Sequence, residues 1–135
     1  MTNRNPNQII QSLSDYLKDR VTFALVYGSI LKSSFNQNSD VDIAVYPKKF
    51  GGTLSDVLDF QTELSDRIQQ DADVVLLDRA DLIITMQILA NGRLIVNNDP
   101  GAFIRFKALK ISQYIDFKMS RKIIEDRMLK GRIYA

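Results

Sequence analysis

Two short apolar segments, one ending in a Gly-Ser pair and the next opening on two aspartates, constrain this fold most. The first segment covers residues 21–27 and is followed directly by Gly28 and Ser29. Ten residues later the second segment begins at Asp40-Val41-Asp42. Side chains alternate between the two faces of a β-strand, so Asp40 and Asp42 point the same way. The pattern predicts two strands connected through a turn, with both carboxylates on one side.

The rest of the chain alternates helical and extended patterns. The pattern predicts two helices in the first part of the chain, over 6–19 and 29–35. A third helix is expected to follow a cap at Thr53 or Ser55 and to run to about 69. Two more are expected from 78 or 79 to 90 and from 100 to about 130. Apolar runs predict strands over 21–27, 40–46 and 72–77, with a short extended piece at 93–96.

This order of elements predicts an α/β (α+β) fold, in which helices pack against a small mixed β-sheet. The 135 residues contain no repeat and no linker, so we expect a single domain over 1–135 with a C-terminal helical region from about 100.

The composition excludes several kinds of chemistry. The chain has no cysteine and no histidine. Zinc–thiolate sites, disulfides and Ser-His-Asp triads are therefore impossible, and any general base is Asp, Glu, Lys or Tyr. The N-terminus lacks an apolar signal core, and no run approaches the ~20 apolar residues of a membrane span. We expect a cytoplasmic protein without membrane contact.

Charge is unevenly distributed along the chain. Residues 1–100 hold nine Lys/Arg and thirteen Asp/Glu, whereas residues 101–135 hold nine Lys/Arg and only three Asp/Glu. A solvated helix face accounts for this excess; an interface with an acidic partner is the alternative. Direct nucleic-acid binding is not expected, because the chain carries no recognition module.

A third carboxylate belongs to the same pattern. Asp73 opens the strand predicted at 72–77, and if that strand lies beside the second one, Asp73 joins Asp40 and Asp42. Oxygen ligands of this kind select Mg²⁺, and three of them can hold two ions that clamp a phosphoryl transfer. Asp73 would also accept the proton of an attacking hydroxyl.

The Gly-Ser turn has the features of a phosphate-binding turn. Gly28 lets the backbone approach closely, Ser29 offers a hydroxyl and an N–H, and Lys32 can balance triphosphate charge. Each feature alone has a plainer interpretation: a solvated strand entry, a helix cap or a surface lysine. Their order along the chain favours metal-assisted chemistry on a nucleotide.

Gly28-Ser29-x10-Asp40-x-Asp42, with Ser39 just before the first aspartate, resembles the signature of the DNA polymerase beta-like nucleotidyltransferase superfamily. The short chain resembles its minimal branch, the MNT-domain antitoxins, which are encoded with a HEPN-domain toxin. Three further segments, at 73–75, 87–96 and 114–117, are similar to that branch. Many relatives have Arg-Gly where this chain has Lys32-Ser33, which keeps the charge but loses the forked geometry of arginine.

The resemblance implies an enzyme that uses ATP and Mg²⁺. It would transfer AMP to a hydroxyl, expected to be a tyrosine, of a cognate HEPN RNase toxin and so neutralise it. Asp40, Asp42 and Asp73 would be the catalytic and metal-binding residues; Gly28, Ser29, Lys32 and Ser39 would bind the nucleotide. Two alternatives stay open: an antitoxin that neutralises by binding alone, and a nucleotidyltransferase that modifies a small molecule, as aminoglycoside-modifying relatives do.

Overall fold

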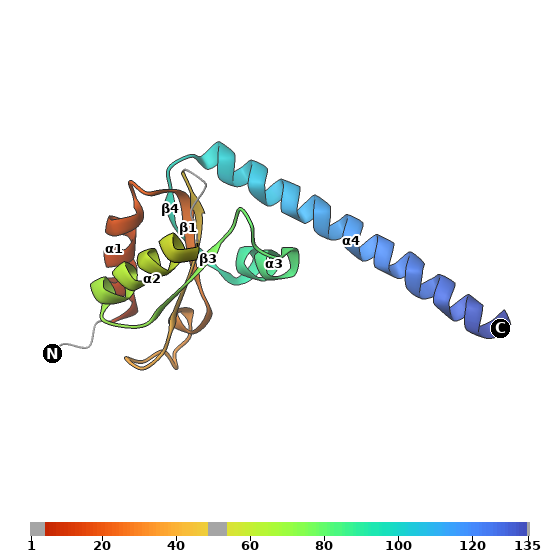
Figure 1. Ribbon diagram of the computed structural model, residues 1–135, viewed down its shortest axis with the longest axis horizontal. Coiled ribbons are helices and arrows are strands. Elements are labelled where there is room, and N and C mark those ends of the chain that lie inside the picture. Colours follow the sequence, from red (N-terminus) through yellow and green to blue (C-terminus); the bar gives the residue numbers. More distant parts are fainter. Residues whose placement is uncertain (1–4, 49–53, 135) are drawn as a thin grey trace.

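A mixed sheet with the strand order β3-β2-β1-β4 organises this structure, a computed structural model that describes residues 5–48 and 54–134 (Figure 1). The strands are β1 (Val21–Tyr27), β2 (Val41–Pro47), β3 (Ala72–Leu76) and β4 (Arg93–Asn97). β1 pairs antiparallel with β2 and with β4, whereas β2 and β3 run parallel. The mixed sheet with packed helices confirms the predicted fold class.

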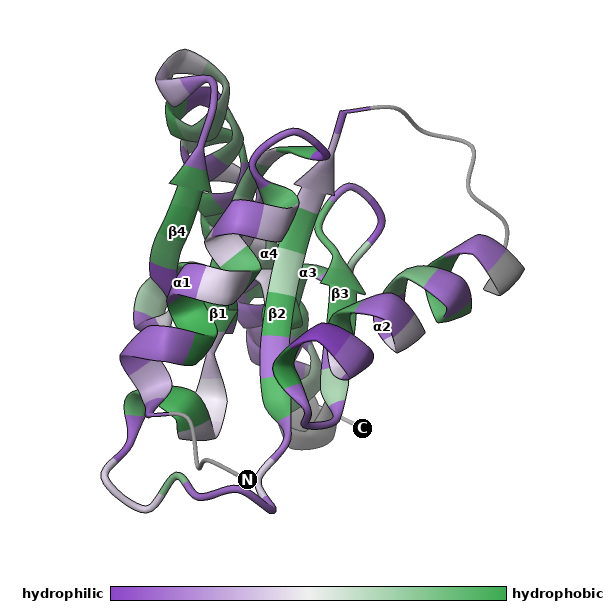
Figure 2. Cartoon of the chain, turned by 90° about the vertical axis from the view of Figure 1, so that its left-hand side faces the viewer, coloured by the Kyte–Doolittle hydropathy of each residue, from purple (hydrophilic) through white to green (hydrophobic). Residues whose placement is uncertain are grey.

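Helices cover both faces of the sheet. α1 (Pro6–Leu17) and α2 (Leu54–Ile68) lie on one face, which is turned to the viewer in Figure 2. α3 (Leu82–Asn91) and the first turns of α4 (Pro100–Tyr134) lie on the other. A short 3-10 turn (Gly28–Leu31) follows β1. Within the described residues, no helix has both the length and the apolar content needed to cross a membrane.

One apolar core lies between the sheet and α1 and α2. Alternate residues of β2, Val41, Ile43 and Val45, are buried in it. The α1 side chains Leu13 and Leu17, one turn apart on the same helix face, are fully buried against them. The alternation of β2 therefore sends Asp42 to the opposite face, as its pattern predicted.

The second core lies on that opposite face and is rich in aromatic residues. The ring of Phe23 lies 5.0 Å from the ring of Tyr46 and 5.0 Å from that of Phe103, centroid to centroid. Phe106 completes the cluster at 5.3 Å from Phe23. These contacts fix the start of α4 to the sheet, and the rest of the helix projects away from the body (Figure 1).

Two predicted helices differ from the structure. The helix predicted over 29–35 is only the 3-10 turn, which ends because Lys32 adopts an extended backbone (φ −111°, ψ 153°). The helix predicted from 78 or 79 begins instead at Leu82, where the Asp81 carboxylate accepts a hydrogen bond from the Ile83 N–H at 2.7 Å and caps the first turn.

Several smaller boundaries also differ. The helix predicted over 6–19 ends at Leu17, and the strand predicted over 40–46 is Val41–Pro47, so Asp40 lies just before β2 rather than in it. The extended piece at 93–96 is a full sheet strand, β4, which pairs with β1. α4 runs beyond the expected end at 130, to Tyr134. Thr53 lies outside the described residues, and Ser55 lies inside α2 rather than before it.

We expect Phe23→Ala to lower the free energy of unfolding by about 3–5 kcal/mol, because it removes the ring on which the aromatic core is centred. Chemical denaturation followed by circular dichroism measures this. Ile104→Ala, at a side chain that is 65% exposed, is the control and should change stability by less than about 0.5 kcal/mol. Equal effects of the two substitutions would contradict this account of the core.

Candidate active site

A polar row crosses the end of the sheet on the α3 side. Tyr27 of β1 is the register partner of Asp42 on β2, and Asp42 is the register partner of Asp73 on β3. Register partners in a sheet place their side chains on the same face. The next row along this face is apolar, with Leu25, Ala44 and Val75 in the aromatic core. The acidic row thus begins where the core ends.

The turn after β1 can be built only with glycine. Gly28 has φ +76°, a left-handed conformation that side chains disfavour. A Cβ built on Gly28 would lie 2.4 Å from Oδ2 of Asp42, which is an atomic overlap. The backbone of the turn therefore lies directly against the Asp42 carboxylate, and no space remains there for a methyl group.

Ser29 and Ser39 hold the two loops in place. The Ser29 hydroxyl donates a hydrogen bond to the backbone carbonyl of Asp40 at 3.1 Å, which ties the turn to the start of β2. The Ser39 hydroxyl accepts from the Asn36 N–H at 3.1 Å. The amide of Gln70 donates to the Ser39 carbonyl at 2.7 Å. Both serines thus position the residues around Asp40.

The carboxylates influence one another. Burial raises the pKa of Asp42, and the negative charges of Asp73 and Asp40 raise it further. Asp42 therefore lies within electrostatic range of both Asp73 and Asp40. Asp40 and Asp73 are exposed to solvent, and Asp42 is partly buried.

Tyr27 responds to the same charges. Burial, followed by the charges of Asp42 and Asp73, raises the pKa of its phenol to about 12. The hydroxyl therefore keeps its proton at neutral pH and remains a hydrogen-bond donor beside the carboxylates.

The donor set fits a divalent cation. Carboxylate oxygens are the ligands that Mg²⁺ prefers, and a cation between Asp42 and its acidic neighbours would relieve their repulsion. Among residues 5–48 and 54–134, however, no three acidic side chains approach one another closely enough to enclose an ion as they stand. The expected three-carboxylate cage is therefore present as neighbouring residues, not as a closed coordination shell.

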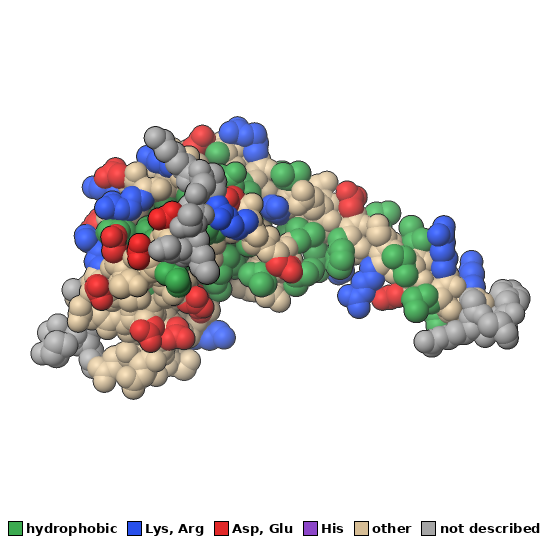
Figure 3. Space-filling view, in the orientation of Figure 1, with side chains coloured by type: hydrophobic (Ala, Val, Ile, Leu, Met, Phe, Trp, Pro, Cys, Tyr) green, Lys and Arg blue, Asp and Glu red, His purple; other side chains and the backbone are tan. Residues whose placement is uncertain are grey.

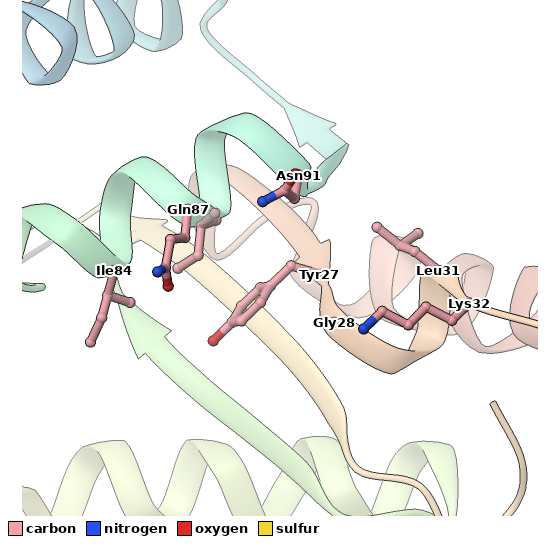
Figure 4. Close-up of a pocket in the computed structure, with 8 residues that line it drawn as sticks. Tyr27, Gly28, Leu31, Lys32, Ile84, Gln87 and Asn91 are labelled. Atoms are coloured by element: carbon pink, nitrogen blue, oxygen red, sulfur yellow. The ribbon is translucent and has the colours of Figure 1, made fainter. Parts of the chain in front are cut away.

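A cavity of about 630 Å³ opens beside the turn, between β1 and α3 (Figure 4). Gly28 and Lys32 line it from the turn, and Tyr27 lines it from the end of β1. Asp42 adjoins it through Gly28. Two of the predicted nucleotide-binding residues therefore share one cavity next to the acidic row, whereas Ser29 and Ser39 are absent from its lining.

Sequence reasoning missed the α3 wall of this cavity. Ile84, Gln87 and Asn91 line it at intervals of three and four residues, so they share one face of the helix (Figure 4). Two amides at this spacing, in a helix whose only other polar side chain is Thr85, were a readable signal. They provide hydrogen-bond donors and acceptors opposite the Gly28 turn, with Ile84 as an apolar neighbour.

Comparisons with known proteins agree with this geometry. Residues 7–101 match the family described as "Polymerase beta, Nucleotidyltransferase". The chain is 25% identical to the protein adenylyltransferase MntA of Shewanella oneidensis over 131 residues, which is 96% of this chain and 91% of the relative.

Solved structures share the fold. A toxin–antitoxin crystal structure with AMP-PNP superposes with a TM-score of 0.71 at 24% identity, covering 93% of this chain and 99% of the other. A tri-AMPylated Shewanella oneidensis HEPN toxin in complex with MNT antitoxin matches with a TM-score of 0.66 at 23% identity, covering 93% and 96%.

We expect Gly28→Ala to be destabilised by roughly 1–3 kcal/mol and to lose nucleotide affinity. An alanine is strained in the left-handed backbone conformation of residue 28, and its methyl group overlaps the Asp42 carboxylate. Thermal unfolding and calorimetry with ATP measure the two effects. Gly101→Ala is the matched control, since its new methyl crowds the movable end of the Arg105 side chain and meets Oδ1 of Asp99 at an ordinary contact distance of 3.5 Å. That variant should be neutral or slightly stabilised. A Gly28 variant that behaves like the Gly101 variant would contradict the proposed close approach.

The raised pKa of Asp42 makes stability depend on pH and on Mg²⁺. In the folded protein the pKa of Asp42 lies above the ordinary value of 3.8. The contribution of Asp42 to stability is therefore fully present below pH 3.8, and it is lost as the pH rises through the pKa of the folded state. At pH 7 in EDTA, Asp42→Asn should therefore melt at a higher temperature than the wild type. Mg²⁺ should raise the melting temperature of the wild type but not of the variant. An equal response of both proteins to Mg²⁺ would rule out Asp42 as a ligand.

Proposed function

Because this chain belongs to the polymerase beta nucleotidyltransferase family, we propose that it transfers AMP from ATP to a tyrosine hydroxyl of a HEPN-domain toxin. The modified toxin is an RNase that loses its activity, so this protein is its antitoxin. The observation that carries the proposal is the acidic row of Tyr27, Asp42 and Asp73 beside the Gly28 turn. That arrangement suits chemistry on a phosphate chain.

The similar proteins indicate which class of molecule accepts the AMP group. The similar Shewanella protein is named a protein adenylyltransferase, and the two solved structures are a toxin–antitoxin with an ATP analogue and an AMPylated HEPN toxin bound to its antitoxin. These matches extend through nearly the whole of this chain, including α4. A protein acceptor is therefore favoured over a small molecule.

The reaction is an in-line displacement at the α-phosphorus of ATP. The acceptor hydroxyl oxygen forms a bond to phosphorus, the bond from phosphorus to the bridging oxygen breaks, and pyrophosphate leaves. In our proposal the Asp73 carboxylate accepts the hydroxyl proton, because it is exposed to solvent and lies beside Asp42. Tyr27 keeps its own proton and does not compete for this role.

Asp40, Asp42 and Asp73 would hold Mg²⁺. When bound, the ion neutralises charge that builds up on the phosphate oxygens. The backbone of Gly28 and Ser29 would face the phosphate chain, and Lys32 would pair with its terminal charge from the cavity edge. Ser39 would act indirectly, by holding the loop that ends in Asp40.

The base would lie along α3. Gln87 and Asn91 each offer an amide, which can donate to and accept from the edge of adenine, and Ile84 offers an apolar contact. We also propose a cytoplasmic site of action, because ATP and RNA, the substrates of the two partners, are found there.

We expect Asp42→Asn to reduce AMP transfer on the order of a hundredfold or more, because an amide carries no charge to hold the cation. Mass spectrometry of the toxin, incubated with the antitoxin, ATP and MgCl2, should show an increase by whole AMP units for the wild type only. Asp59→Asn, an exposed carboxylate on α2, is the matched control and should retain full activity.

Cell survival separates this proposal from neutralisation by binding alone. Cells that express the toxin should be protected by the wild-type antitoxin but not by the double variant Asp40→Asn/Asp42→Asn. Full protection by the double variant, with an unmodified toxin, would show that catalysis is dispensable.

A further inference from the structure

Ten of the fourteen large hydrophobic side chains that are exposed in the described part of the chain lie on one helix, α4. They are not spread evenly over the molecule, and most of them lie on the part of α4 that projects from the body (Figures 1 and 3). A concentration of this kind marks a surface that a partner covers.

One face of α4 continues the aromatic core beyond the body. Phe103 and Phe106 pack on Phe23, and positions three or four residues apart extend the same face. These positions are Lys110, Tyr114, Phe117, Arg121, Ile124 and Met128. We call Tyr114, Phe117, Ile124 and Met128 the distal stripe. Phe117, Ile124 and Met128 are 43%, 57% and 59% exposed.

The distal stripe begins at a groove between α3 and α4. A cavity of about 710 Å³ is lined by Ile83 on one side and by Tyr114 and Phe117 on the other. Lys118, Lys122 and the ion pair of Arg121 with Glu125 line it as well. The groove therefore combines apolar side chains with three basic groups and one acidic group.

This groove lies next to the nucleotide cavity. Ile83 lines the groove and its neighbour Ile84 lines the cavity, so the first turns of α3 separate the two. A protein seated in the groove would be beside the nucleotide, where a transferable AMP is needed.

We propose that the distal stripe and the α3–α4 groove are the docking surface for the acceptor protein, which meets them with a helical ridge of apolar side chains flanked by carboxylates. This inference rests on the proposed function. The part of α4 beyond Tyr114 holds about five and a half turns, or about 30 Å, which is long enough for side-by-side helix packing.

Charge favours an acidic partner over a second copy. Residues 101–135 hold nine basic and three acidic side chains, so two copies of α4 would repel each other. The family match ends at residue 101, where α4 begins, so the helix lies outside the part of the chain that the catalytic family defines. The charge excess therefore favours a different, acidic protein as the partner of α4.

The test uses the full chain, its HEPN-domain toxin and calorimetry. The double variant Phe117→Ser/Ile124→Ser should bind the toxin at least about tenfold more weakly, because it removes two anchors of the interface. It should require more toxin for half-maximal AMP transfer, while its affinity for ATP and its melting temperature stay at the wild-type values.

The matched control is Met119→Ser/Ile123→Ser. These side chains are 60% and 51% exposed on the opposite face of the same helix, so their loss should leave toxin binding unchanged. Lys118→Glu/Lys122→Glu should slow association and reduce its dependence on salt, whereas Lys130→Glu, on the far face, should not.

The outcomes separate the two proposals. If the stripe variant binds and modifies the toxin like the wild type, the docking surface is wrong and AMP transfer stands. If the wild type binds the toxin through the stripe without modifying it, the surface stands and AMP transfer is wrong. A stripe-dependent dimer of this protein alone, or stripe-dependent binding to anionic vesicles, would also overturn the docking assignment.

Discussion

Repulsion between carboxylates that the sheet holds side by side is the constraint on which this molecule depends. Backbone hydrogen bonds of three strands align Tyr27, Asp42 and Asp73, and burial prevents water from fully screening Asp42. The adjacent turn approaches so closely that only glycine fits at position 28. A cation and a phosphate chain, which carry opposite charges, would together satisfy both the acids and the turn.

Such a site costs stability, and the two apolar cores offset that cost. On one face, α1 and α2 bury Leu13 and Leu17 against β2. On the other, the ring of Phe23 contacts Tyr46, Phe103 and Phe106. The acidic row is the next cross-strand row after this aromatic core on the same face of the sheet. The packed core therefore directly supports the strand ends that carry Asp42 and Asp73. Hydrophobic burial holds the carboxylates closer together than they would remain in water.

α4 connects the catalytic body to a recognition surface. Its first turns are part of the aromatic core, and the following turns extend a helix that would be marginal in isolation. Phe117, Ile124 and Met128 are apolar without being buried by this chain. In the proposed complex, the partner buries them and simultaneously brings its hydroxyl to the neighbouring nucleotide cavity. Catalysis and docking then depend on the same two helices, α3 and α4.

The sequence alone determined the local part of this arrangement. Alternation along β2 placed Asp42 on the face opposite Val41 and Ile43, and the Gly28-Ser29 pair after an apolar strand marked the turn, because strand periodicity and backbone preference are properties of neighbouring residues.

The tertiary structure alone decided which distant segments meet. It placed β3 parallel to β2, so that Asp73 lies beside Asp42, and it inserted β4 next to β1. It also placed Gln87 of α3 and the Gly28 turn around one cavity and engaged the Ser29 hydroxyl with the Asp40 carbonyl. No local pattern encodes these pairings, since the order of strands in a sheet depends on the path of the whole chain and on which buried surfaces fit together.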